Sequence, residues 1–180
     1  LRVIGANWRE NFEQTREFIG RTITPHEFEL VREKVNGFMK ARVRLFEERA
    51  AEGRIRDCHG DIHSGNIFVA DRIYIFDAIE FNERFRYSDV ASDVAFLAMD
   101  LDFKGRTDLS TSFVESYVEY SGDRGLTELL PFYKCYRAYV RGKVASFRLN
   151  DPHIGDDEKF ASMNEARGYF KLAHAYTEKF

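Results

Sequence analysis

The sequence predicts a mainly helical chain with one small β-hairpin, an α+β fold class. Apolar residues recur at three- and four-residue steps over most of the chain, the spacing that is typical of helices packed on a core. Two short runs differ from this pattern, since they are rich in β-branched and aromatic residues and only Asp71 and Arg72 separate them. Such a short separation between two strand-like runs is typical of a hairpin.

The composition predicts one domain with an aromatic core. The chain has 180 residues, of which 44% are hydrophobic, and it contains 17 Phe and 9 Tyr. A chain of about 150 residues already buries about 70% of its extended surface, so we expect residues 1–180 to form a single domain. The net charge of −3 is mixed along the chain, and no apolar run approaches the ~20 residues of a membrane span. These features argue against nucleic-acid and membrane partners.

The spacing of the two cysteines indicates their redox state and, through it, the cellular compartment. Cys58 and Cys135 stand far apart, without the spacing of a zinc site or a redox motif. We therefore expect two buried, reduced thiols and a cytoplasmic protein, because disulfides are rare in the cytosol.

Two helices are predicted in the first 50 residues. The first covers Arg9–Phe18, with phenylalanines as its apolar anchors. The second begins after Thr24, because Thr24 suits the N-cap, Pro25 suits the first helical position and Glu27 completes a capping box. Its apolar face is expected to continue through Glu48. That face carries Phe28, Val31, Val35, Phe38 and Leu45.

The later elements surround the hairpin. A short strand at Ile55–Cys58 leads into a loop, and the hairpin follows with arms at Asn66–Ala70 and Ile73–Asp77. Ser88 is the candidate N-cap of a helix over Asp89–Leu101, which is apolar nearly all round and therefore buried. Three more helices are expected over Leu109–Gly122, Glu128–Asn150 with Pro131 in its first turn, and Asp156–Phe180.

Residues that can carry chemistry gather around the hairpin. They are His59, Asp61, His63, Asn66, Asp77 and Glu80. The arms of a hairpin lie side by side, so Asn66 and Asp77 are expected to be neighbours, with Asp61 in the loop that leads in. Mg²⁺ takes oxygen ligands, and one or two carboxylates usually hold it together with substrate phosphates. The pattern therefore indicates a magnesium-dependent phosphate site.

The spacing within this stretch resembles that of a known family. The pattern His59-x-Asp61-x-x-x-x-Asn66, with Asp77 one hairpin later, has the form of the kinase catalytic loop. Written as His-Gly-Asp-x-His-x-x-Asn and then hydrophobic-Asp-x-x-Glu, it resembles the aminoglycoside phosphotransferase and choline kinase branch of the kinase-like fold. The segment from Ile79 to Asp102 is most similar to a bacterial group of aminoglycoside-phosphotransferase-like proteins. This resemblance implies the C-terminal lobe of a protein-kinase-like fold.

The resemblance also implies an activity and residue roles. The activity is ATP-dependent transfer of a phosphoryl group to the alcohol group of a small molecule. Asp61 would orient or deprotonate the acceptor hydroxyl, while Asn66 and Asp77 would hold Mg²⁺ on the phosphates of ATP. Supporting roles are expected for His59, His63, Glu80 and Asp93. Asp93 would brace the loop backbone, and it needs hydrogen bonds in any case because an unpaired carboxylate among apolar residues is costly.

The motifs with which a kinase binds the nucleotide phosphates do not occur upstream of His59. Residues 1–58 contain no Gly-x-Gly-x-x-Gly loop, no P-loop motif and no strand-borne lysine, which kinase-like enzymes use to hold the nucleotide. We therefore expect residues 1–180 to be a C-terminal lobe that lacks its N-terminal lobe. Alone, it is expected to bind ATP poorly and to self-associate through Ile67, Ile75 and Phe81 near the hairpin.

Two other interpretations stay open. One is a non-catalytic, kinase-like binding or regulatory module, although Asp61, Asn66 and Asp77 are all present. The other is a metal-dependent hydrolase that uses His59, Asp61 and His63 as ligands, which predicts a tightly bound transition metal. The sequence does not indicate the acceptor.

Overall fold

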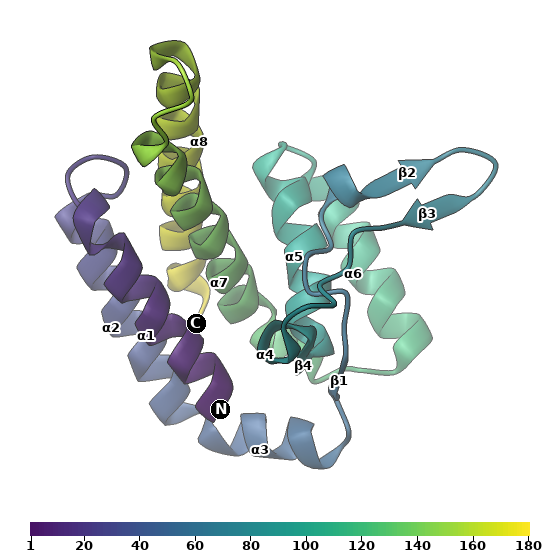
Figure 1. Ribbon diagram of the computed structural model, residues 1–180. Helices are drawn as coiled ribbons and strands as arrows, with labels where there is room; N and C mark the ends of the chain where they lie inside the picture. Colours follow the sequence, from purple (N-terminus) through teal and green to yellow (C-terminus); the bar gives the residue numbers. More distant parts are fainter. The chain divides into compact units, whose positions relative to one another are not determined.

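The computed structural model describes residues 1–180 and confirms a mainly helical chain with a few short antiparallel strands (Figure 1). The chain divides into two compact units, which consist of residues 1–42 with 135–180 and of residues 43–134. Helix α7 (Leu126–Phe147) contributes to both. None of the helices combines the length and the apolar character needed to cross a membrane.

The first unit is all helical. Its elements are α1 (Arg2–Thr15), η1 (Arg16–Phe18), α2 (Pro25–Ala41), the second part of α7, η3 (Arg148–Asn150), α8 (Asp156–Tyr176) and η4 (Thr177–Lys179). Aromatic rings fill its core, as the composition predicted. The Trp8 ring is fully buried; it stacks on Phe12 with 5.1 Å between ring centroids and meets the Tyr139 ring edge-on at 5.3 Å.

Helix α2 begins as predicted and ends earlier. Both hydrogen bonds of the Thr24–Glu27 capping box form, and Pro25 is the first helical residue. The helix stops at Ala41, however, and Arg42 leaves the helical conformation before α3 (Val43–Ala51) starts. The continuous helix through Glu48 was therefore a wrong prediction. Within α3, Phe46 and Arg49 are buried.

The second unit holds two small antiparallel sheets. Strand β1 (Ile55–Asp57) pairs with β4 (Tyr87–Asp89), and β2 (Ile67–Val69) pairs with β3 (Ile73–Ile75). The remaining elements are η2 (Ser64–Asn66), α4 (Glu83–Arg86), α5 (Val90–Phe103) and α6 (Thr107–Ser121). The hairpin was predicted, whereas β4 was not. Ser88 lies in β4, so the N-cap of α5 is Asp89, whose carboxylate accepts a hydrogen bond from the Ala91 N–H.

Some predicted details were wrong. Helix α7 begins at Leu126, which places Pro131 inside the helix instead of in its first turn. Two aromatic residues on other helices, Tyr120 of α6 and Phe160 of α8, are exposed. The thiol of Cys135 is buried as expected, but that of Cys58 is only partly buried.

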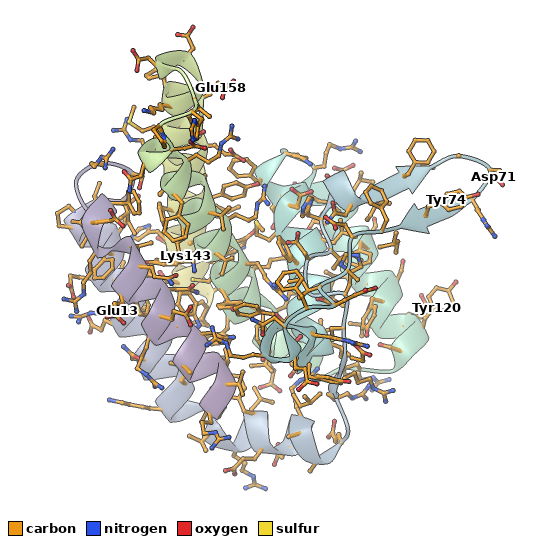
Figure 2. The ribbon with its side chains drawn as sticks, in the orientation of Figure 1. Glu13, Asp71, Tyr74, Tyr120, Lys143 and Glu158 are labelled. Carbon is orange, nitrogen blue, oxygen red and sulfur yellow. The ribbon has the colours of Figure 1, made fainter.

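The hairpin is mostly exposed. Its β-branched and aromatic side chains face solvent to a large extent, and so does the segment that follows it. The exposed residues are Phe68, Val69, Ile73, Ile75, Phe76 and Phe81, the last with 87% of its surface accessible. Figure 2 shows Asp71 and Tyr74 at the outer end of the hairpin. The predicted exposure of Ile75 and Phe81 is thus confirmed, while Ile67 is half-buried.

Candidate active site

The loop after β1 begins beside β4. The Cys58 N–H donates to the Arg86 carbonyl at 2.9 Å. The Arg86 guanidinium, in turn, binds the Asp57 carboxylate through two nitrogens at 2.6 and 2.5 Å. This bidentate contact raises the pKa of Arg86 and lowers that of Asp57. The start of the loop is therefore held by a backbone hydrogen bond and by a side-chain ion pair, both with Arg86.

Asp93 holds the start of the loop. Its carboxylate accepts the His59 N–H at 2.7 Å and the Gly60 N–H at 3.0 Å. These are the partners that a carboxylate needs among the buried Val94, Ala95 and Phe96 of α5. The arrangement ties the backbone just before Asp61 to a buried helix.

Gly60 is required by the loop conformation. Its φ of +82° lies in the left-handed region, and a Cβ there would meet the Ile79 side chain at 3.2 Å. Glycine adopts positive φ without steric cost. A larger residue at this position would push the loop away from the segment that follows the hairpin.

Three hydrogen bonds bring the far end of the hairpin back to the loop. The Phe76 N–H donates to the Asn66 carbonyl at 3.1 Å, and the Ile79 N–H donates to the His59 carbonyl at 2.9 Å. The His59 Nε2 lies 2.9 Å from the Phe76 carbonyl, while its Nδ1 accepts the Asp61 N–H at 3.3 Å. His59 therefore bonds both segments. Asp77 lies between Phe76 and Ile79, on the strip of chain that these bonds hold.

Asn66 offers its amide oxygen. The side chain is 8% exposed, and its Nδ2 donates to the Asp61 carbonyl at 3.0 Å. Because the nitrogen is used inside the loop, the Oδ1 is the atom that is left to accept a hydrogen bond or bind a cation. Asn66 also links the Asp61 backbone to the hairpin through its own carbonyl.

Asp77 has an unusual backbone conformation. It is the only non-glycine residue with positive φ, at +64°, in a region that costs L-residues about 1–2 kcal/mol. Residues kept in such conformations often belong to functional sites. Its exposed carboxylate and the Asn66 oxygen fit Mg²⁺, which takes one or two carboxylates together with substrate phosphates. A common ion shared by Asp61, Asn66 and Asp77 stays a prediction.

His63 packs and bonds beside Asp61. Its Nδ1 accepts the Gly65 N–H at 3.1 Å, and its ring lies 5.8 Å from that of Phe96 on α5. The Nε2 is 3.7 Å from the Asp61 carboxylate. His63 thus turns the chain into η2 with its ring beside Asp61. Glu80 is exposed, and its negative charge contributes to raising the pKa of Arg86.

The hydrolase interpretation receives no support. No three His, Cys, Asp or Glu side chains are grouped so that they could hold a metal ion. Both imidazoles of the proposed ligand set are also engaged by backbone groups, His59 with Asp61 and Phe76 and His63 with Gly65. A transition-metal site would need these nitrogens for the metal.

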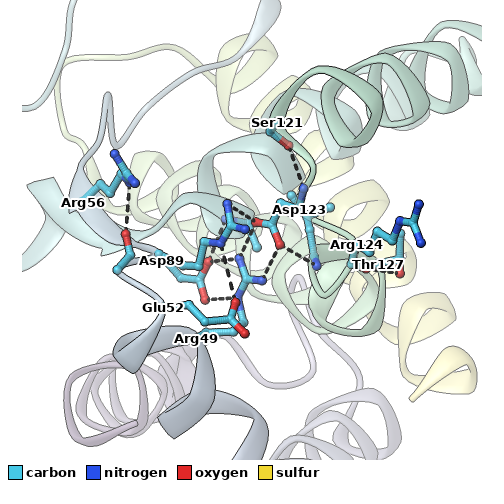
Figure 3. A network of polar contacts seen from close by, with 12 residues as sticks. Arg49, Glu52, Arg56, Asp89, Ser121, Asp123, Arg124 and Thr127 are labelled. Atoms are coloured by element: carbon cyan, nitrogen blue, oxygen red, sulfur yellow. Dashed lines mark hydrogen bonds and ion pairs between the residues drawn. The ribbon is translucent and has the colours of Figure 1, made fainter.

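Sequence reasoning missed a buried ion-pair network that supports the site (Figure 3). The Arg49 guanidinium on α3 binds Asp89 at 2.6 and 2.7 Å and Asp123 at 2.8 and 2.9 Å. Burial alone would lower the pKa of Arg49, but its bonds to the two carboxylates leave it raised. Asp89 caps α5 and Asp123 accepts the N–H of Leu126, the first residue of α7. One arginine therefore joins the starts of two helices.

A second contact that the sequence did not reveal lies further along α5. The Asp100 carboxylate accepts the Ser64 N–H at 2.9 Å, and Lys104 approaches both residues. Asp100 is buried in the same helix that carries Asp93.

The mainly helical fold with its small hairpin is consistent with a kinase-like fold. Residues 2–132 match the model of the phosphotransferase enzyme family, and the chain belongs to this family. Similar proteins include uncharacterized proteins of Mycobacterium bovis and of two strains of Mycobacterium tuberculosis. Each is 36% identical over 148 residues, which is 82% of this chain and 30% of the length of the relative. No solved structure matches the chain significantly.

Replacing Asp93 by alanine is expected to lower the free energy of unfolding by about 1–3 kcal/mol, because two loop N–H groups lose their acceptor. Chemical denaturation measures the change. Asp108→Ala is the matched control, since Asp108 also lies in the first turn of a helix but is exposed. If the two variants unfold alike, Asp93 does not hold the loop.

Proposed function

We propose that the protein is an ATP-dependent phosphotransferase that phosphorylates the hydroxyl group of a small molecule. The observation that carries this proposal is the hydrogen-bonded junction of loop and hairpin. Its hydrogen bonds join the Asp61 backbone to the Asn66 side chain, and they join Asn66 and His59 to the chain on either side of Asp77, which supports a common site for the three residues. Phosphoryl transfer depends mainly on positioning and charge neutralisation, which such a junction supplies.

We assign separate roles in metal binding and proton transfer to these residues. The Asn66 oxygen and the Asp77 carboxylate would hold Mg²⁺, which would supply neutralisation of phosphate charge. Asp61 orients the acceptor hydroxyl and takes its proton as the oxygen bonds to the γ-phosphorus. The bond between that phosphorus and the bridging oxygen breaks, and its electron pair leaves with ADP. Loss of the proton at Asp61 then resets the site.

Location and association are further parts of the proposal. The partly and fully buried thiols of Cys58 and Cys135 carry no disulfide, which fits a cytoplasmic protein. The exposed apolar side chains of the hairpin favour self-association of residues 1–180 when they are prepared alone.

Asp77 variants of the full-length protein test the proposed metal role. Asp77→Ala and Asp77→Gly are both expected to weaken Mg·ATP binding in calorimetry by at least tenfold, because both remove a carboxylate ligand. They should differ in stability. Alanine retains the strain of positive φ and glycine does not, so the alanine variant should unfold more readily, by about 1 kcal/mol.

The control is Asp71→Ala at the tip of the hairpin, which removes the same charge outside the junction. Unchanged Mg·ATP affinity in both Asp77 variants would exclude Asp77 as a metal ligand. Loss of affinity in the Asp71 variant as well would indicate a general effect of charge.

A further inference from the structure

Asp100 binds the end of the active-site loop in the way that Asp93 binds its start. The two aspartates are seven residues apart on α5, so they lie on one face of the helix, two turns apart. Asp93 accepts the N–H groups of His59 and Gly60, and Asp100 accepts the N–H of Ser64. Only the segment 61–63 lies between the two attachments.

From this geometry we infer that Asp100, with its partner Lys104, is a positioning residue that fixes Asp61 and Asn66 for the proposed phosphoryl transfer. The effect of Asp100 on catalysis rests on the proposed function. Its effect on the position of the loop rests on the contacts of the loop alone. Asp100 acts through the backbone and has no contact with reacting atoms.

The burial of Asp100 shows that its carboxylate needs polar partners. Its side chain is 4% exposed, and a buried carboxylate is costly unless it is paired and hydrogen-bonded. Lys104 supplies the pairing, with Nζ 3.2 Å from the Asp100 carboxylate and a further hydrogen bond to the Ser64 hydroxyl. Burial alone would raise the pKa of Asp100, but the bonds from Ser64 and Lys104 lower it, so the group stays ionised.

The effect reaches the proposed active residues through one short turn. Ser64 is the first residue of η2, and Asn66 is its last. The Asn66 side chain holds the Asp61 carbonyl, and its backbone carbonyl holds Phe76 beside Asp77. A shift of Ser64 would therefore move Asn66 relative to both aspartates. Misplacement by about 1 Å can lower a rate by about a hundredfold.

The same helix offers a matched control. Asp102 is also on α5, and its carboxylate is paired with Lys134 at 2.8 Å. Its partner Lys134 lies on α7, outside the loop. Asp102→Leu therefore removes a lysine-paired, partly buried carboxylate two residues away, and it leaves the Ser64 attachment in place.

The experiment compares Asp100→Leu, Asp100→Asn, Lys104→Met and Asp102→Leu in the full-length protein. Asp100→Leu is expected to lower kcat for ADP release from Mg·ATP by about 10- to 100-fold, with a smaller change in KM. Asp100→Asn retains an oxygen acceptor for the Ser64 N–H and should recover most of that loss. Lys104→Met, at an exposed position, should fold normally and show a partial loss. Asp102→Leu should keep the parental kcat.

Amide nuclear magnetic resonance supplies a readout that does not depend on turnover. The amide signals of Ser64, Asp61 and Asn66 should shift in Asp100→Leu and Lys104→Met but not in Asp102→Leu. If the parent protein shows no turnover, the proposed function fails while these spectra still decide whether Asp100 positions the loop. The inference is overturned if Asp100→Leu and Lys104→Met leave the three signals in place, or if folded variants of both keep the parental kcat. Equal losses in the Asp100 and Asp102 variants would also overturn it.

Discussion

Arg49→Leu is expected to lower the free energy of unfolding by about 3–5 kcal/mol, because it leaves two buried carboxylates without their cation. The side chains of Arg49 and Asp89 are each 2% exposed, and that of Asp123 is 1% exposed. The loss should appear in chemical denaturation as a large shift of the midpoint. Both helix starts that Arg49 joins, those of α5 and α7, are affected at once.

Two further variants make this prediction specific. Arg44→Leu removes an arginine from the same helix, but its partner Glu48 and Arg44 itself are exposed, so it should change stability far less. Adding Asp123→Asn to Arg49→Leu should restore part of the loss, since it removes one of the two buried negative charges that Arg49 compensates. A parental midpoint for Arg49→Leu would show that the network contributes little.

Asp61→Asn in the full-length protein is expected to lower turnover of Mg·ATP by about 10²–10⁴-fold while nucleotide affinity changes little. The asparagine keeps the shape of the side chain but cannot take the proton of the acceptor hydroxyl, and general-base catalysis contributes a factor of that size. Release of ADP in the presence of a panel of alcohols measures the rate, and calorimetry measures binding.

The control for Asp61→Asn is Asp71→Asn, which makes the same chemical change at the hairpin tip and should keep the parental rate. Turnover within a few-fold of the parent in Asp61→Asn would assign the proton transfer to another group. A loss of nucleotide affinity equal to the loss of rate would instead place Asp61 among the metal ligands.

The hairpin and the helix start at Thr24 could be predicted because local chemistry decides them. A two-residue gap between β-branched runs specifies a turn, and a capping box satisfies N–H groups of its own helix. The hairpin alone predicts that Asn66 lies near the chain around Asp77. In the structure, the hydrogen bond between Asn66 and Phe76 joins these two segments.

Arg49 could not be predicted because arginine is seldom buried and its partners are distant in the sequence, Asp89 by 40 residues and Asp123 by 74. No proline or glycine marks residues 41–43, so the apolar periodicity of α2 was extended across Arg42. Once α3 is recognised as a new helix, Phe46 and Arg49 fall on one face at a three-residue step. Asp100 was hidden for a similar reason, since its partner Ser64 lies 36 residues away in an irregular segment.

The attachments to helix α5 should determine how the candidate active-site loop opens. A loop tied to a helix at only one point can open by itself, as surface loops commonly do at little free-energy cost. Here both ends of the segment 61–63 are attached to α5, whose first turn is in turn held by Arg49. The loop should therefore open only when part of α5 opens, as one cooperative unit. The outer part of the hairpin is exposed and should open more readily, whereas Asp77 lies at its base, between Phe76 and Ile79, which are both bonded to the loop.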